Sequence, residues 1–210
     1  MSRHISFPLA ITLVCLVLVS CATVTQQTEK ESAVARQPAT WPAEKEKRQQ
    51  VDIWEIRGRL GLQTDKTGGT MDIIWKQAGD DYTIRLIAPL GAGSYMIQGG
   101  KDFAEIRFPN GEKQVVDNID DVFASALEVD LPASAVKDWV RGLPARALSV
   151  EQVEWNDRGL IKRIKQSGWN VEMTKYSGVK ISFPHNIYVS RDDNEALDVR
   201  LILRQWLIDN

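Results

Sequence analysis

Histidine is scarce in this chain, which limits the catalytic chemistry open to it. Of the two histidines, only His185 lies beyond the first 20 residues. A Ser-His-Asp triad built on His185 stays open, but no Gly-x-Ser-x-Gly segment is present to expose a nucleophilic serine. His185 follows Pro184 in a Phe-Pro-His-Asn stretch that is typical of a solvated turn. We therefore expect His185 to be a turn residue.

Paired carboxylates are the other candidate for catalysis, because glycoside hydrolysis uses two of them. The pairs Asp80-Asp81, Asp120-Asp121 and Asp192-Asp193 lie in predicted turns or at a helix start, where Asp is common for structural reasons. Gly68-Gly69 and Gly99-Gly100 have no following helix and so form no phosphate loop. With two cysteines in all, a Cys-rich zinc site is not expected either. The sequence predicts a protein that is not an enzyme.

The N-terminus carries the most specific chemical signal. Arg3 precedes an apolar run from Ile5 to Val19, which is too short for a permanent membrane span and is typical of a signal peptide. The run ends in Leu18-Val19-Ser20-Cys21, which resembles the lipobox, where cleavage leaves an N-terminal cysteine for acylation. We expect residues 1–20 to be the signal peptide and Cys21 to carry lipid.

Acylation of Cys21 would fix the location of the mature protein. Cys15 leaves with the signal, so Cys21 has no partner for an internal disulfide. Two or three acyl chains make attachment to a membrane effectively permanent. Ala22 stands where an Asp would favour the inner membrane, which points to the periplasmic face of the outer membrane. This covalent lipid is the only cofactor-like group expected.

Charge and composition predict one domain on a tether. Without Arg3, 25 basic residues face 28 acidic ones, and no basic run supports nucleic-acid binding. Residues 21–42 are rich in Thr, Gln, Ser and Glu and predict a flexible tether. Residues 43–210 are expected to form one domain. Ala43 to Ile53 predicts a short helix that buries Val51 and Ile53.

From Trp54 the hydropathy alternates with the period of two that marks a half-buried strand. Hairpin turns are expected at Lys66 to Gly69, Gly79-Asp80, Gly99-Gly100 and Asn110-Gly111. The alternating segments together predict about eleven antiparallel strands, too many for a flat sheet, so a curved, barrel-like sheet is favoured. The expected strands lie around 54–62, 71–75, 82–86, 95–97, 104–108, 153–155, 160–165, 169–173, 179–183, 187–189 and 197–203.

Two amphipathic helices are predicted between the strand series. The first has Ile119, Phe123 and Leu127 on one face, with Asp117 or Asn118 as its cap. The second begins near Pro132, carries a stripe that includes Val136, Trp139 and Leu143, and ends at Gly142 and Pro144. Because each helix is apolar on one side only, both should lie on the sheet.

Apolar residues leave two questions open. The tryptophans are expected to fill a core in preference to lining a lipid cavity, although a curved sheet under helices often encloses space. Leu90 sits beside Pro89 at a hairpin tip. From sequence alone, a tip leucine is expected to fold back over the sheet edge.

Several segments, taken in order, resemble the outer-membrane lipoprotein receptor family, LolB. None is diagnostic alone, but their combination with a lipobox is specific, and the match runs from about Trp54 to the end of the chain. The segments are Ile56-Arg57-Gly58-Arg59-Leu60, Gly69 to Gln77 with Trp75, Leu86-Ile87-Ala88-Pro89-Leu90-Gly91, Leu131-Pro132, Asp138-Trp139-Val140-Arg141-Gly142-Leu143-Pro144, Gly168-Trp169-Asn170-Val171 and Leu201 to Ile208 with Trp206.

The resemblance implies a fold, a function and partners. The fold would be a single incomplete antiparallel β-barrel of about eleven strands, closed by an α-helical lid over a hydrophobic cavity. Such a protein, expected to be a monomer, would take acylated lipoproteins from the periplasmic carrier LolA and place them in outer-membrane lipid, without nucleotide or metal. The rivals are a lipoprotein scaffold of an envelope assembly complex and a carboxylate-dependent envelope hydrolase.

The resemblance also assigns site residues. It makes Pro89, Leu90 and Gly91 a protruding loop whose leucine enters the membrane, against the expectation from the hairpin alone. Alternation and helix stripes then give the acyl-chain cavity that the family uses. Its expected lining is Trp54, Ile56, Leu60, Ile73, Trp75, Ile84, Leu86, Phe123, Trp139, Trp169, Val199 and Leu201.

Overall fold

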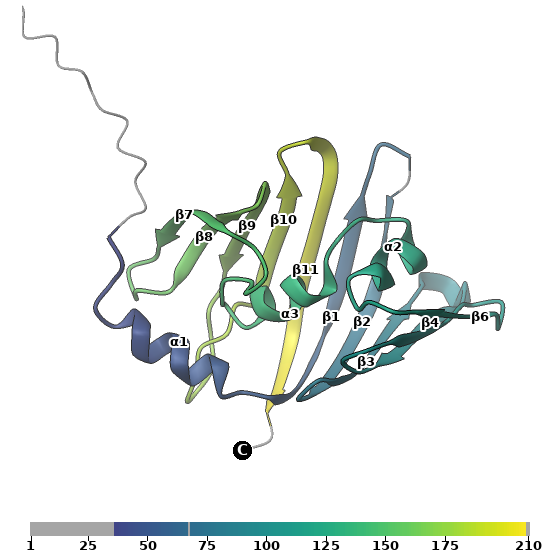
Figure 1. Cartoon of the computed structure of the whole chain (residues 1–210), viewed down its shortest axis with the longest axis horizontal. Coiled ribbons are helices and arrows are strands. Elements are labelled where there is room, and N and C mark those ends of the chain that lie inside the picture. The colour runs from purple at the N-terminus through teal and green to yellow at the C-terminus, as the bar shows by residue number, and fades with distance from the viewer. Residues whose placement is uncertain (1–35, 67, 209–210) are drawn as a thin grey trace, which may run out of the picture. The chain divides into compact units, whose positions relative to one another are not determined.

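The fold is one curved antiparallel sheet with helices on its concave side (Figure 1). The computed structural model describes residues 36–66 and 68–208, so the signal peptide, Cys21 and most of the expected tether lie outside the described residues. The strands are β1 (Ile53–Gln63), β2 (Gly68–Ala78), β3 (Asp81–Ile87), β4 (Ser94–Gly99), β5 (Ala104–Arg107), β6 (Lys113–Val116), β7 (Val150–Trp155), β8 (Ile161–Gln166), β9 (Trp169–Thr174), β10 (Asn186–Arg191) and β11 (Asn194–Ile208).

Strand order follows the chain except at one place. The order is β6-β5-β4-β3-β2-β1-β11-β10-β9-β8-β7, so nearly every pair is a hairpin between consecutive strands. The exception is the pairing of β1 with β11, which brings the first and last strands together at the middle of the sheet. The edges β6 and β7 stand at opposite ends of this order. The predicted incomplete barrel with a helical lid is confirmed.

Alternation along each strand separates two faces. On β1, Trp54, Ile56 and Leu60 are buried, and the partner strands bury Ile73, Trp75, Val199 and Leu201 on the same side. The opposite face carries ion pairs between neighbouring strands, such as Lys76 Nζ with Glu55 Oε2 at 3.4 Å. The concave face is therefore the apolar one, and it is the face that the helices cover.

Of the three helices in the described part of the chain, the second and third close that face along the connection from β6 to β7, and the first precedes β1 (Figure 1). Their bounds are α1 (Trp41–Gln49), α2 (Asp121–Leu127) and α3 (Ala133–Val140). As predicted, α3 follows Pro132 and ends before Gly142, whose φ is +74°. For α2 the predicted cap is wrong, because the N-cap is Asp120; Asn118 Oδ1 accepts a hydrogen bond from the Asp120 backbone N–H at 3.0 Å just before the helix.

The predicted N-terminal helix is wrong in its bounds and in one of its two expected buried residues: Val51 is buried, just after the helix, but Ile53 is not. Helix α1 is Trp41–Gln49, not Ala43 to Ile53, and it buries Trp41 and Arg48. Ile53 lies on the outer face of β1 and is 50% exposed. The helix buries Arg48 because the guanidinium bonds Glu44 and, through Nη2, the Ser182 carbonyl oxygen at 2.7 Å. Hydropathy alone does not show such a partner.

Two strand predictions fail in opposite directions, which leaves the expected total unchanged. The expected strand at 179–183 is a loop with only an isolated bridge between Ser177 and Phe183, and Val179 is fully exposed. The short strand β6 was not expected, because among its four residues only Val116 is buried. Pairing with β5, not side-chain alternation, makes β6 a strand.

Candidate functional site

The twelve residues expected to line the interior come together in one buried cluster. Each is at most 3% exposed, and they come from β1, β2, β3, β9, β11 and both lid helices. Tryptophans make up much of this cluster, with ring centroids 5.6 Å apart for Trp54 and Trp75 and 6.0 Å apart for Trp139 and Trp169. The space between sheet and helices is therefore apolar and packed with large side chains.

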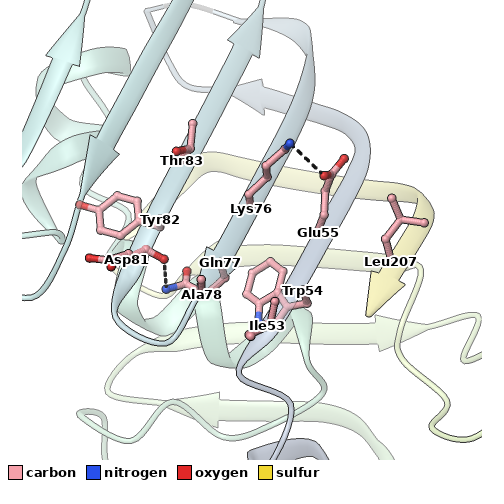
Figure 2. Close-up of a pocket in the computed structure, with 10 residues that line it drawn as sticks. All are labelled: Ile53, Trp54, Glu55, Lys76, Gln77, Ala78, Asp81, Tyr82, Thr83 and Leu207. Carbon is pink, nitrogen blue, oxygen red and sulfur yellow. Dashed lines mark hydrogen bonds and ion pairs between the residues drawn. The ribbon is translucent and has the colours of Figure 1, made fainter. Parts of the chain in front are cut away.

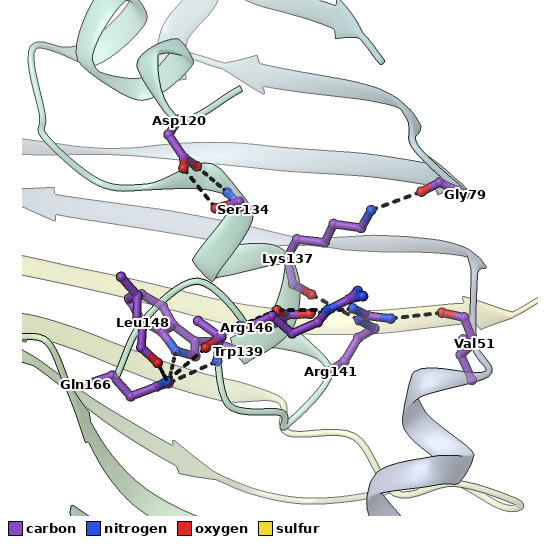
Figure 3. Close-up of polar contacts among 12 residues, drawn as sticks. Val51, Gly79, Asp120, Ser134, Lys137, Trp139, Arg141, Arg146, Leu148 and Gln166 are labelled. Carbon is purple, nitrogen blue, oxygen red and sulfur yellow. Dashed lines mark hydrogen bonds and ion pairs between the residues drawn. The ribbon is translucent and has the colours of Figure 1, made fainter. Parts of the chain in front are cut away.

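Helix α3 is fixed to the sheet by a buried glutamine that sequence reasoning missed (Figure 3). Gln166 Oε1 accepts hydrogen bonds from Trp139 Nε1 at 3.1 Å and from the Ala145 backbone N–H at 2.9 Å. Its Nε2 donates to the carbonyl oxygens of Ala145 and Leu148, both at 3.0 Å. The sequence held one signal for this contact: Gln166 stands two positions after inward-facing Ile164, so alternation places this polar side chain on the inner face.

A buried ion pair adds to this anchor at the same, C-terminal end of α3 (Figure 3). Arg141 Nη2 donates to Asp138 Oδ1 at 2.6 Å, and Nη1 reaches the Val51 carbonyl oxygen at 3.3 Å. Burial lowers the pKa of Arg141, and the Asp138 carboxylate opposes that shift. Burial, together with nearby Arg141, likewise lowers the pKa of Lys137, whose Nζ donates to the Gly79 carbonyl oxygen at 2.9 Å. Polar contacts thus hold the C-terminal half of α3.

Helix α2 is held differently. It buries Val122, Phe123 and Ala126, and Asp120 before it accepts hydrogen bonds from the backbone N–H and Oγ of Ser134 at 2.7 and 2.9 Å. Gln114 Nε2 donates to Ser125 Oγ at 3.4 Å. Contacts of α2 with the sheet are thus mostly apolar, in contrast to those of α3.

A pocket of about 440 Å³ opens where β1 begins and β2 turns into β3 (Figure 2). Its lining mixes inner-face Trp54 with outer-face Glu55 and Lys76, which form an ion pair. Such a mixed, charged lining does not suit a hydrocarbon chain. Trp54 is 2% exposed, and its Nε1 has no hydrogen-bond partner among the described residues.

The loop between β3 and β4 presents Leu90 to solvent, and the expectation that this leucine folds back is wrong. Leu90 lies in the 3-10 turn η1 (Pro89–Gly91), is fully exposed, and has φ 57° and ψ 25°. A left-handed backbone is rare for a leucine because its Cβ crowds the following carbonyl. Hydrogen bonds from the Ala88 N–H to the Gly93 carbonyl oxygen and from the Ala92 N–H to that of Pro89 brace the loop.

Comparison with known proteins decides the family. The model of the family described as outer membrane lipoprotein LolB matches residues 52–206. The chain belongs to the LolB family. An outer-membrane lipoprotein LolB of Alkalilimnicola ehrlichii is 30% identical over 195 residues, covering 92% of this chain and 93% of that protein. Another, from Ectopseudomonas mendocina, is 29% identical and covers 98% and 97%.

Solved structures agree on the fold. A LolA superfamily protein from Nitrosomonas europaea superposes with a TM-score of 0.54 at 9% identity, covering 80% of this chain and 93% of that one. At that identity the likeness concerns fold alone. The LolB family match and this superposition both fit the open eleven-stranded sheet described above.

The candidate catalytic groups of this LolB family member have structural partners. Ser177 Oγ lies 2.9 Å from His185 Nε2, but the other ring nitrogen, Nδ1, lies 2.9 Å from the Leu203 carbonyl oxygen, where a triad would have a carboxylate. His185 is half-buried, so the expected solvated turn residue is instead part of a hydrogen-bonded bend. Its bonds join the β9–β10 loop to β11.

The acidic pair Asp192-Asp193 also binds neighbours. A hydrogen bond from Lys165 is the main cause that lowers the pKa of Asp192, and Arg191 does the same for Asp193. Across residues 36–66 and 68–208, no three His, Cys, Asp or Glu side chains come together as metal ligands. In the same part of the chain, no helix has the length and apolar character to cross a membrane.

Proposed function

We propose that this protein is a lipoprotein receptor of the outer membrane. It accepts acylated lipoproteins from a periplasmic carrier of the LolA type, shelters their acyl chains between sheet and lid, and releases them into the membrane. Membership of the LolB family and the apolar interior support this proposal. The protein itself is anchored at the periplasmic face by lipid on Cys21.

The interior suits acyl chains because it offers apolar surface and few charges. Each methylene moved from water into such surroundings stabilises the complex by roughly 0.8 kcal/mol. The twelve buried residues of the interior are the proposed lining. Since the tryptophans now pack on one another, cargo would enter as the lid and the tryptophan side chains move apart.

Leu90 is the single observation that carries the release step. Its left-handed backbone and full exposure hold an apolar side chain in water, which is unfavourable unless another phase receives it. The chain braces the loop in this conformation through the Ala88 and Ala92 hydrogen bonds. We propose that Leu90 inserts into the outer membrane while cargo leaves.

The test compares Leu90→Glu with Val179→Glu, because Val179 is the other fully exposed apolar residue among those described. Each variant is made in a soluble Cys21→Ala chain. Purified carrier loaded with lipoprotein supplies the cargo, and liposomes accept it. Leu90→Glu should still accept cargo but insert it at least tenfold more slowly, whereas Val179→Glu should match the parent. Equal insertion by Leu90→Glu and its parent would refute the role of the loop.

A further inference from the structure

A groove of about 600 Å³ lies beside the loop that carries Leu90, outside the twelve-residue interior. One wall is formed by Ala88, Pro89 and Ala92 of that loop. The other walls come from the end of α2 and from the ends of β1, β2 and β4. The residues that carry the argument are Leu62, Gly69, Met71, Tyr95, Ala126 and Leu127.

The groove continues the apolar face of the sheet. Met71 stands two residues before buried Ile73 and pairs with buried Leu60, and Tyr95 pairs with buried Leu86. Leu62, Met71, Tyr95 and Leu127 are partly buried and pack against the core. One apolar surface therefore runs from the closed interior to the foot of the Leu90 loop.

The chemistry of the lining favours a hydrocarbon. Glu128 is the one charged residue among the described residues that line the groove. By comparison, a neighbouring pocket at Thr64 and Asp130 is also lined by Asp65, Lys66, Glu128, Arg191 and Asp193. The volume of the groove falls within the usual range for a small ligand site.

Gly69 keeps the groove open. It pairs with Leu62 and stands two residues before Met71, so a side chain at position 69 would point to the inner face. A Cβ built there would meet no atom within 4 Å, and Gly69 does not have a positive φ. Neither its backbone angle nor close packing requires glycine at this position, so the missing side chain leaves space.

We propose that this groove is a transit site for one acyl chain of the lipoprotein cargo, between the interior and the membrane at Leu90. The inference rests on the proposed function and adds a second, outer position for the chain. An acyl chain in the groove would touch Met71, Tyr95 and Leu127 and would lie against the loop that contacts the bilayer. Cargo would then leave the interior without crossing water.

Gly69→Phe fills the groove from a position with open space, and Gly61→Phe is the matched control. Gly61 lies on the opposite face of β1, where a Cβ would make only an ordinary contact, 3.6 Å from Arg200 Cβ. In the Cys21→Ala chain, Gly69→Phe should slow transfer of a triacylated cysteine peptide to liposomes at least tenfold. Gly61→Phe should stay within twofold of the parent. A folded Gly69→Phe chain that transfers at the parent rate overturns the proposal.

Crosslinking keeps the proposal testable if Gly69→Phe fails to fold. The parent chain is loaded with a triacylated cysteine peptide that carries a diazirine on one acyl chain, and adducts are mapped by mass spectrometry. Adducts on Met71, Tyr95 or Leu127 support the transit site. Peptide that binds and transfers without adducts there overturns the transit site alone, whereas a parent chain that binds no peptide overturns the proposed function.

Two further experiments identify which molecule occupies the groove. Liposomes that contain a diazirine phospholipid, without acylated peptide, should give no adducts in the groove. Adducts from phospholipid alone would mean that the groove takes membrane lipid in place of cargo. A dimer of the parent chain that Gly69→Phe abolishes would assign the groove to a second copy. Either result overturns the proposal.

Discussion

Two buried polar side chains, Gln166 and Tyr82, differ in whether their polar atoms form hydrogen bonds. Gln166 makes four hydrogen bonds, which offset the loss of water around its amide. Tyr82 is 4% exposed, and its hydroxyl has no hydrogen-bond partner among the described residues. Burial, with a smaller effect of Asp120, raises the pKa of Tyr82 to about 12. One residue fastens the lid, while the other is a local source of instability.

Replacing Tyr82 by Phe should therefore not destabilise the protein at neutral pH. Since the hydroxyl is unbonded, its removal should leave the free energy of unfolding unchanged or raise it by about 1 kcal/mol. The raised pKa means that the neutral phenol is favoured in the folded state. Its stabilisation is complete below pH 10, the unfolded value, and is lost as the pH rises to about 12.

The loss of this stabilisation at high pH predicts the direction in which the two chains should differ. Urea unfolding of both chains at pH 8 and at pH 11.5 should show the Tyr82→Phe chain gaining about 2 kcal/mol on its parent across that interval. A loss of more than about 1 kcal/mol at pH 8 would show that the hydroxyl has a partner. A gap that does not change with pH would contradict the raised pKa.

At the scale of elements, the pairing of β1 with β11 joins both halves of the sheet. The register shifts between Arg57 and Gly58, and the strands come very close there. A Cβ on Gly58 would lie 2.2 Å from the Ile202 carbonyl oxygen and 2.8 Å from Leu203 Cα, which are backbone atoms of a central strand. Only glycine fits this contact without a shift of the backbone.

Gly58→Ala should therefore cost about 2–4 kcal/mol of unfolding free energy, as overpacking against rigid atoms does. Gly61→Ala, three residues along the same strand, adds its methyl group at an ordinary contact distance and should change stability by less than about 1 kcal/mol. Urea unfolding of the two variants is the check. Equal effects would show that β11 yields at the bulge.

Elements with a clear hydropathy period could be predicted from the sequence. Prediction failed where the alternation of side chains and their actual burial disagree. Val179 to Phe183 alternates like a strand, but the chain turns at Gly178, with φ 146°, and leaves Val179 in water. β6 buries one residue in four, so its existence depends on pairing with β5.

The candidate site divides in the same way. Alternation placed the strand residues of the interior on one face, because a strand has only two faces, and the helix stripes added Phe123 and Trp139. The exposure of Leu90 followed only from family resemblance, since a hairpin tip can bend either way and its direction is set by the loop backbone. Gly69 was expected in a turn, and its inward position depends on a register with β1 that local sequence does not show.

At the scale of the whole molecule, the first described residues and the Leu90 loop contact distant parts of the sheet. Trp41 of α1 contacts Trp155 of β7, with ring centroids 5.0 Å apart, and Thr40 lies against Gly159 in the β7–β8 turn. Leu90 follows β3. From β8 to β3 the sheet order passes six strand intervals, which is roughly 30 Å along the sheet.

If Leu90 is to reach the same membrane as the proposed lipid anchor, the tether must bridge the distance between these two parts of the sheet, which is at most the roughly 30 Å measured along its curve. If the 16 residues from Ala22 to Gln37 form the expected flexible tether, they would have a coil dimension of about 22 Å and a fully extended reach of about 55 Å. The reach is thus sufficient, with moderate extension. Tether length is therefore expected to limit insertion without affecting the capture of cargo.

Deleting residues 24–33 leaves six residues, whose reach of about 20 Å is less than the separation along the sheet. In proteoliposomes, the lipid-anchored deletion variant should insert cargo at least tenfold more slowly than the full-length chain. Ten Gly and Ser residues in place of the deleted segment should restore the rate, because length and not sequence is required. The same deletion in a Cys21→Ala chain should accept cargo normally, since residues 36–208 are intact. Insertion at the full rate by the shortened, anchored chain would contradict this prediction. It would show that the anchor and Leu90 need not reach the same membrane at once, and that the release step does not depend on the loop.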